Sequence, residues 1–206
     1  MRSQCVLVTI RPEDPHKMDA FFISTGLVAL AEMGDKTQLL SLVLAAKFRK
    51  PRPIVLGIFV ATLVNHGLAG ALGAWITTML GPDVLRWILG ISFIVMAGWM
   101  LIPDKLDDDT ANSSGRWGIF GTTVVLFFLA EMGDKTQLAT VGLAAQYPTQ
   151  YFWVVAGTTL GMMLANAPVV WFGEKITQKL PIKTIHRVCA VIFLLLGIGA
   201  LFAKLN

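Results

Sequence analysis

One stretch of ten residues occurs twice in the chain without a change. Residues 30–39 read LAEMGDKTQL, and residues 129–138, which lie 99 positions later, read LAEMGDKTQL again. Each copy places two acids and a lysine within a long apolar segment. Composition alone does not produce such an identity, so the chain consists of two related halves.

The composition around these copies is typical of a membrane protein. Of the 206 residues, 55% are hydrophobic and only 15% are charged, and the mean hydropathy is +0.66. Ordinary soluble domains carry about 25% charged residues. About 20 apolar residues cross a hydrocarbon core as a helix, and the chain has six such stretches, at 19–46, 54–80, 84–102, 117–145, 151–173 and 184–203. The sequence therefore predicts an all-α membrane protein with six transmembrane helices, and it excludes a soluble enzyme.

The two copies lie in the first and fourth stretches, so each half contributes three helices. Because three crossings is an odd number, the halves enter the membrane from opposite sides and form a 3+3 inverted-topology repeat. Such repeats are typical of secondary transporters, whose ion site lies near mid-membrane. We expect four segments: an N-terminal, disordered tail at 1–17, a first repeat at 18–102, an acidic cytoplasmic linker at 103–116, and a second repeat at 117–206.

The basic residues predict the orientation. Ten of the 17 lysines and arginines follow the first, third and fifth stretches, and five lie on the other side. Cytoplasmic loops are enriched in lysine and arginine, so both termini are expected on the non-cytoplasmic side. The same placement argues against nucleic-acid binding despite the net charge of +4. The outer surface of the helices is then expected to contact the lipid bilayer. The sequence leaves open whether the chain also forms a homodimer.

The candidate metal ligands are the acids and amides of the repeat. Glu32 and Asp35 are three residues apart and share a face of a helix, and the second copy repeats this arrangement. Carboxylate and amide oxygens suit Mn2+, Ca2+ and Mg2+, whereas Zn2+ and copper sites generally recruit His or Cys, which neither copy contains. The expected ligands are Glu32, Asp35, Gln38, Asn65, Glu131, Asp134, Gln137 and Asn166. The two asparagines follow at spacings that differ by one residue between the halves.

A glycine stands next to each aspartate of the repeat. Gly34 and Gly133 permit close backbone approach or a local unwinding that frees carbonyl oxygens. On a continuous helix, Thr37 and Thr136 lie on a different side from the acids, and we expect them to bond to the backbone. A break at the glycine would change that expectation.

The charges of the two copies add up to minus two, because four acids stand against Lys36 and Lys135. A charge at the bilayer centre costs at least about 2.5 to 3.5 kcal/mol, so we expect one divalent cation or two protons to neutralise the site. Competition of metal and protons for one set of carboxylates is the basis of cation/proton exchange. The structural alternative is that each acid pairs with the lysine one or four residues along, which leaves two acids unpaired.

A histidine outside the repeat lies in the second predicted helix. His66 follows Asn65, and it is either a proton relay or a helix-packing residue. The second half has no histidine at this point, because Ala167 follows Asn166. Helix packing is the more common role of such a histidine.

The doubled motif Glu-x-Gly-Asp-Lys-Thr resembles that of the UPF0016/GDT1 family of small membrane proteins, and the similarity extends from Met18 to Asn206. The resemblance implies a secondary exchanger of Mn2+, or of Ca2+ in eukaryotic members, for protons. It also implies that the motif acids bind the ion. Prokaryotic members are associated with manganese export, which implies a multi-pass protein of the bacterial inner (plasma) membrane.

Two other classes of function were weighed against this resemblance. A divalent cation channel without proton coupling could use the same acids and stays as the alternative. A membrane enzyme would need a nucleophile or a cofactor motif on the aqueous side, and the sequence contains none. We therefore expect a transporter that has no cofactor and carries Mn2+ or Ca2+ and protons.

Overall fold

A computed structural model describes residues 16–102, 117–173 and 182–202 of the chain. This part of the chain is helical and contains no strand, which confirms the predicted all-α class. Its elements are α1 (His16–Glu32), α2 (Lys36–Phe48), α3 (Pro51–Met79), α4 (Pro82–Trp99), α6 (Gly118–Glu131), α7 (Lys135–Gln146), the short 3-10 helix η1 (Pro148–Gln150), α8 (Tyr151–Phe172) and α10 (Ile182–Phe202). The predicted linker and all but the last two residues of the predicted tail lie outside the described residues.

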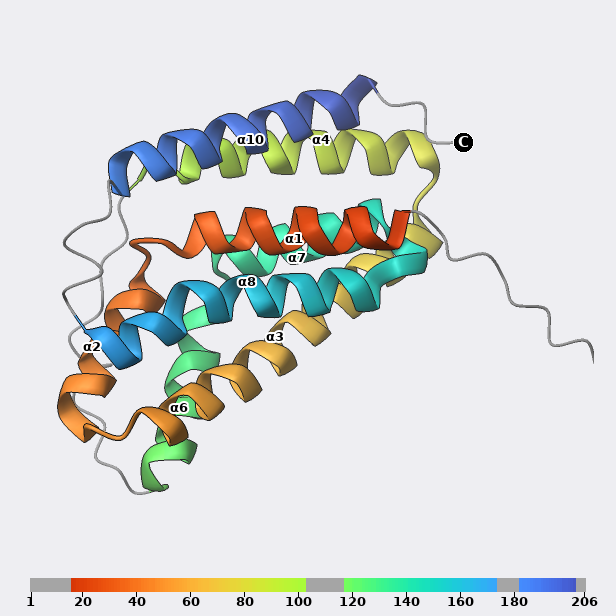
Figure 1. Ribbon diagram of the computed structural model, residues 1–206. Coiled ribbons are helices and arrows are strands. Elements are labelled where there is room, and N and C mark those ends of the chain that lie inside the picture. Colours follow the sequence, from red (N-terminus) through yellow and green to blue (C-terminus); the bar gives the residue numbers. More distant parts are fainter. Residues whose placement is uncertain (1–15, 103–116, 174–181, 203–206) are drawn as a thin grey trace, which may run out of the picture.

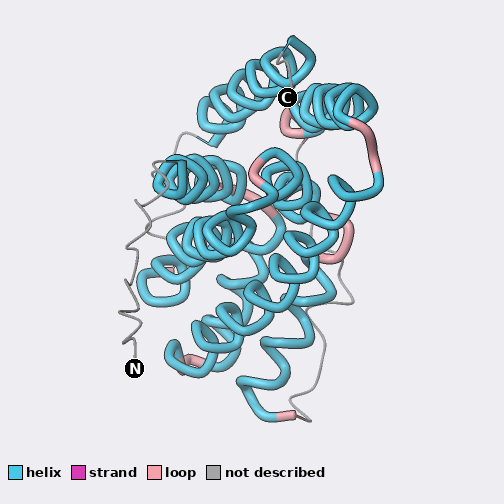
Figure 2. The backbone as a smooth tube through the Cα atoms, turned by 90° about the vertical axis from the view of Figure 1, so that its right-hand side faces the viewer, coloured by secondary structure: helices cyan, strands magenta, loops and turns pink. Residues whose placement is uncertain are grey.

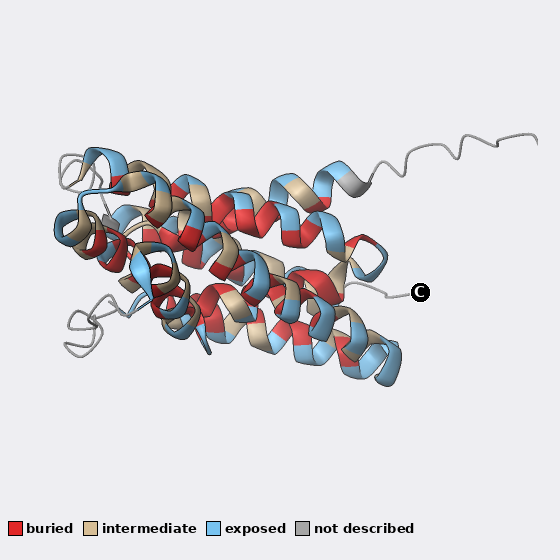
Figure 3. Cartoon of the chain, turned by 90° about the horizontal axis from the view of Figure 1, so that it is seen from below, coloured by how far each residue is buried: buried red, intermediate tan, exposed pale blue. Residues whose placement is uncertain are grey.

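Four of the described helices are long and apolar enough to cross a membrane. They cover Pro51–Met79, Pro82–Trp99, Pro148–Phe172 and Lys183–Phe202, and Gly118–Glu131 is apolar but shorter. Figure 3 shows that the buried residues face the interior of the bundle and the exposed ones face outward. Much of the outward surface is apolar, as at Leu68, Trp171 and Leu195. An apolar exterior of this kind suits a bilayer.

The structure corrects the expectation that each copy of the repeat lies in one continuous helix. The stretch 19–46 forms α1 and α2, and the stretch 117–145 forms α6 and α7. The interruption has a local cause, because Gly34 and Gly133 have φ angles of 84° and 74°. Only glycine adopts this left-handed conformation without strain. Identical sequences therefore break two helices at the same point.

The first helix of each half packs along α3 or α8 of the other half. Helix α1 lies along α8, and α6 lies along α3. A Cβ added at Gly157 of α8 would lie 2.5 Å from the Phe21 carbonyl oxygen of α1, and one added at Gly57 of α3 would lie 2.7 Å from Cβ of Thr123 in α6. Glycine at such contacts is typical of helix pairs in membranes.

Helices α4 and α10 form a pair at one side of the bundle (Figures 1 and 2). They cross at Gly90 and Gly197, where a Cβ added at Gly197 would lie 2.8 Å from the Gly90 carbonyl oxygen. The pair also packs on the rest of the bundle, α10 against α1 and α4 against α7. The apolar cluster between them includes Leu27, Ala31, Phe93, Met96, Leu143 and Phe193.

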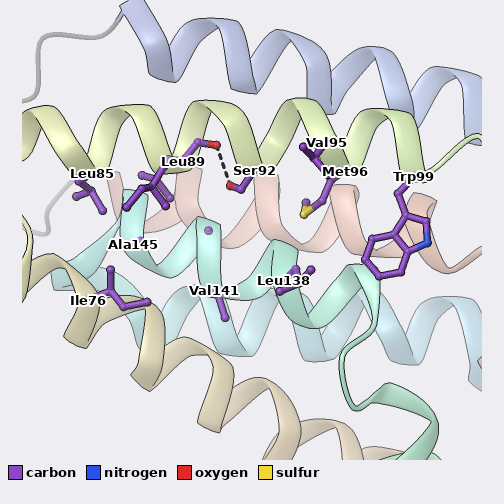
Figure 4. Close-up of a pocket in the computed structure, with 12 residues that line it drawn as sticks. Ile76, Leu85, Leu89, Ser92, Val95, Met96, Trp99, Leu138, Val141 and Ala145 are labelled. Carbon is purple, nitrogen blue, oxygen red and sulfur yellow. Dashed lines mark hydrogen bonds between the residues drawn. The ribbon is translucent and has the colours of Figure 1, made fainter.

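An apolar groove of about 280 Å³ lies between α4, α7 and the end of α3. In Figure 4, Leu85 and Trp99 of α4 face this groove together with Leu138 of α7. The Ser92 hydroxyl donates to the Leu89 carbonyl at 2.9 Å, so it needs no partner from the groove. No acid of the repeat lines the groove, so the motif residues must be sought elsewhere in the bundle.

Candidate metal centre

The two helix breaks bring acids of both copies together inside the bundle. Glu32 and Glu131 are 0% exposed, and Asp35 and Asp134 are 1% exposed. One carboxylate oxygen from each of Glu32, Asp35 and Asp134 lies within 4.8 Å of the others. Glu131 lies outside this group of three and adjoins it through Thr136, whose hydroxyl lies 3.0 Å from Glu131 Oε2 and 3.5 Å from Asp134 Oδ2. The described residues thus form one acidic cluster that draws on both halves.

The lysines of the repeat pair across the two halves. Lys36 Nζ lies 2.9 Å from Asp134 Oδ1, and Lys135 Nζ lies 3.2 Å from Asp35 Oδ1. These ion pairs join opposite copies, whereas the structural alternative drawn from the sequence paired neighbours within one copy. Each aspartate is compensated by the lysine of the other half. The two negative charges left in the cluster therefore belong to the glutamates.

Each glutamate accepts a hydrogen bond from the threonine five residues along. Thr37 Oγ1 donates to Glu32 Oε2 at 2.5 Å, and Thr136 Oγ1 donates to Glu131 Oε2 at 3.0 Å. The expectation that these hydroxyls bond to the backbone applied to a continuous helix, and the break instead turns each threonine toward its acid. Within the described chain, Oε1 of both glutamates has no hydrogen-bond partner. A buried carboxylate oxygen without a partner is costly, and a cation or a proton would remove that cost.

The aspartates lie at the start of the second helix of each broken pair. Asp35 and Asp134 are the N-cap residues of α2 and α7, and Asp134 Oδ2 accepts from the Thr136 amide at 3.4 Å. A helix N-terminus carries partial positive charge and unpaired N–H groups. The two helix ends therefore favour negative charge at this point of the bundle.

The glutamines stabilise the breaks. Each side-chain oxygen accepts from the glycine N–H four residues earlier, at 2.9 Å for Gln38 and 2.8 Å for Gln137. Each side-chain nitrogen reaches the other half, where Gln38 donates to the Ala165 carbonyl at 3.0 Å and Gln137 donates to Asn65 Oδ1. The glutamines thus tie each break to a helix of the opposite half, and their role as metal ligands stays a prediction.

The two asparagines make different contacts. Asn65 accepts from Gln137, whereas Asn166 Oδ1 accepts from Ser41 Oγ at 2.8 Å. Sequence reasoning missed Ser41, although it lies three residues after Gln38 and so on the same side of α2. Metal binding by either asparagine also stays a prediction.

Register along the bundle explains why the asparagines differ. Gly57 of α3 and Gly157 of α8 make equivalent contacts with the first helix of the other half, and they are 100 residues apart. By the same offset, the residue of α3 that corresponds to Asn166 is His66 and not Asn65. The one-residue difference in spacing therefore reflects two different places in the packing. His66 is fully buried, and neither ring nitrogen has a hydrogen-bond partner among the described residues.

Comparison with known proteins gives consistent matches. A family model described as "Divalent cation/proton antiporter GDT1" matches residues 20–108 and 119–206, once in each half. A Vibrio cholerae protein named "Putative manganese exporter" is 52% identical over 187 residues, which cover 91% of this chain and 92% of that protein. A GDT1-like protein of Synechocystis is 26% identical over 208 residues, with 91% and 99% covered. GDT1-like protein 3 of Oryza sativa subsp. japonica is 27% identical over 215 residues, with 91% and 75% covered.

No solved structure matches the chain significantly. The family model nevertheless covers both repeats, and the Vibrio cholerae relative shares half of its residues across almost the whole length. The members of this family are transporters rather than enzymes, and the family implies no resident cofactor. Its described substrates, a divalent cation and protons, agree with a buried cluster of carboxylates. The chain belongs to the GDT1 family of divalent cation/proton antiporters.

Proposed function

We propose that this chain exports Mn2+ from the bacterial cytoplasm in exchange for protons. The cross-paired acidic cluster carries the proposal, because the two ion pairs neutralise the aspartates and leave two buried glutamates. One divalent cation or two protons balance a charge of minus two, so the two substrates compete for one site. The oxygen ligands suit Mn2+ and Ca2+ alike. The name of the Vibrio cholerae relative favours manganese.

The ion in this proposal is held by Glu32, Asp35, Glu131 and Asp134. Three of them already place oxygens within 4.8 Å of one another. The unpartnered Oε1 atoms of the glutamates supply further coordination points. The side-chain amides of four residues complete the coordination shell of the ion or hold the two helix breaks in place: Gln38, Asn65, Gln137 and Asn166.

We further propose six crossings in a 3+3 inverted repeat, with repeats at 18–102 and 117–206. Each broken pair, α1–α2 and α6–α7, counts as one crossing. Figure 1 supports this arrangement, since α3, α6 and α10 begin at one end of the bundle and α1, α4 and α8 begin at the other. Broken helices of this kind form the ion sites of many secondary transporters.

The proposed cytoplasmic end is the one at which α3 and α10 begin. Basic residues concentrate there, at Lys47, Arg49, Lys50, Arg52, Lys183 and Arg187. The positive-inside rule places such an end in the cytoplasm. Both termini then face away from the cytoplasm across the inner membrane, and the acidic linker at 103–116 lies on the cytoplasmic side.

Charge balance also suggests the stoichiometry. A divalent ion is held inside a negative cell by about 4.6 kcal/mol at 100 mV, since each charge contributes about 2.3 kcal/mol. Two protons that enter for each ion that leaves cancel this electrical cost. The pH gradient alone then drives export.

The test is flux of Mn2+, Ca2+ and Mg2+ in proteoliposomes under an imposed pH gradient, with the membrane potential clamped at zero or at minus 100 mV. Two-for-one exchange predicts a Mn2+ flux that follows the pH gradient and hardly changes with voltage. A channel would instead conduct without a pH gradient, and its flux would follow the voltage. A reversal point that moved with voltage would reject two-for-one exchange and report the true ratio.

A further inference from the structure

A side chain of α10 contacts the break in the first motif. His186 of α10 places Nε2 2.8 Å from the carbonyl oxygen of Met33. A carbonyl oxygen only accepts hydrogen bonds, so the imidazole carries a hydrogen on Nε2 and donates it. His186 is 9% exposed, so this bond lies inside the bundle.

The Met33 carbonyl is a backbone group of the break whose hydrogen-bond partner is a distant residue. Its neighbours are satisfied locally: the Asp35 amide donates to the Glu32 carbonyl at 3.1 Å, and the Gly34 amide donates to the Gln38 side chain at 2.9 Å. The histidine that serves Met33 is 153 residues away in the sequence. Carbonyls that are shielded from water need a protein partner, and this one is partly shielded, so α10 contributes to the structure of this break.

The equivalent helix does not cover the second break in the same way. Helix α10 packs on α1, whereas α4 packs on α7, the helix that follows the second break. Met33 and Gly34 are accordingly half-buried, while Met132 is 55% exposed and Gly133 is exposed. The Met-Gly turn of the first motif is thus more covered than that of the second, although Lys36 is 25% exposed and Lys135 only 3%.

We propose that His186 is a positioning residue that latches α10 onto the first break and keeps that motif covered. The proposal rests on the proposed exchange function, in which the two halves alternate in access to the site. A bond that covers one motif but not its copy biases the balance between the two access states. Release of the latch would then uncover the first motif.

Hydrogen–deuterium exchange on the full-length protein tests the latch without transport. The two motifs share ten residues, so their intrinsic exchange rates match, and any difference between them reports the structure. We expect slower exchange at 32–38 than at 131–137 in the wild type. His186→Ala should speed exchange at 32–38 by about three- to tenfold, the change that loss of one net hydrogen bond produces, and should leave 131–137 unchanged.

Two further variants separate the latch from general packing. His186→Gln keeps an N–H donor and should restore most of the protection. Val188→Ala removes an exposed side chain from the same helix and should change nothing at either motif. A merely structural role for His186 would raise exchange in both motifs and throughout α10.

Equal exchange of the two motifs in the wild type would overturn the latch, even if His186→Ala does not fold. So would a folded His186→Ala protein with unchanged exchange at 32–38. These outcomes are distinct from failure of the proposed function, which would appear as absent proton-coupled Mn2+ flux while the exchange difference persisted.

Discussion

The two copies of LAEMGDKTQL have the same chemistry in different surroundings. In both, the glutamate accepts from a threonine, and the aspartate pairs with the lysine of the other copy. Yet the side chain of Lys36 is 25% exposed and that of Lys135 is 3% exposed. The first break is covered by α10, and the second is open. Ten residues thus set the local chemistry of the cluster, while helices outside the motif set how far each break is exposed.

The largest expected effect tests whether the two copies are equal partners in one site. Replacement of Glu32 or Glu131 by Gln should abolish Mn2+ transport to the same degree, because each change removes a charge that the ion needs and keeps the volume. The same holds for Asp35→Asn and Asp134→Asn. Mn2+ uptake into proteoliposomes measures the loss, and size-exclusion chromatography shows that the variants fold.

Asp83→Asn is the matched control for these acids, because that carboxylate is 90% exposed and pairs with Arg86 at 3.3 Å. It should transport at the wild-type rate. Wild-type rates in any two of the four amide variants would contradict the shared site. A loss in one copy alone would show that the copies are not equivalent.

Substitution of the two lysines should lower the stability of the protein by different amounts. Each lysine change leaves an aspartate that is 1% exposed without its cation, and for Lys135→Gln this costs about 3 to 5 kcal/mol. Lys36→Gln should cost less, because Lys36 is 25% exposed and solvent already screens its ion pair in part. Thermal unfolding in detergent compares the two. The double variant Lys135→Gln with Asp35→Asn should recover stability without transport, since it removes both charges. Equal losses for the two lysines would remove the proposed asymmetry.

The same lysine variants should change the pH dependence of transport in one direction. Either change gives the site a net charge of minus three. The carboxylates then retain one more proton, and this proton must leave the site before the ion binds. The pH profile of Mn2+ flux should therefore shift to higher pH. An unchanged profile would place the lysines outside the electrostatic field of the site.

A smaller effect is expected at the threonines. Thr37→Val and Thr136→Val each remove a hydrogen bond to a carboxylate, worth about 1.5 to 3 kcal/mol, and should raise the KM for Mn2+ by about tenfold or more. Thr136 should be the more sensitive, because its hydroxyl also lies 3.5 Å from Asp134 Oδ2. Thr→Ser at either position keeps the hydroxyl and serves as the control. Wild-type kinetics in both valine variants would contradict a role in orienting the acids.

The smallest effect concerns the contacts between the halves. Gly57→Ala and Gly157→Ala should each destabilise the protein by about 1 to 3 kcal/mol through overpacking. The two costs should be similar, because a Cβ at Gly157 would meet the Phe21 carbonyl oxygen and one at Gly57 would meet Thr123 Cβ, and the backbone fixes the position of both atoms. Gly67→Ala is the control, since no atom lies within 4 Å of its added Cβ. An equal loss of stability in Gly67→Ala would show that the glycine contacts between the halves make no specific contribution to stability.

Much of the site could be predicted from the repeat, and the contacts that could not be predicted lie at the two helix breaks. The clustering of the acids and the charge of minus two depend only on residue types in apolar segments. The expected backbone bonds of the threonines assumed a continuous helix, and so did the structural alternative in which each lysine pairs within its own copy. That geometry does not hold at Gly34 and Gly133. Asn65 and Asn166 make different contacts because they do not occupy equivalent positions in α3 and α8. The one-residue difference in their spacing indicated this, but it did not show which residue of α3 corresponds to Asn166.

The sequence by itself determined which groups enter the bundle and where its helices can break. Charge and hydropathy belong to residue types, and only glycine tolerates the positive φ that each break requires. The tertiary structure decided which partner each group meets: Lys36 with Asp134, Lys135 with Asp35, and His186 with the Met33 carbonyl. These choices depend on the packing of helices that lie far apart in the chain, and that packing differs around two identical stretches of ten residues.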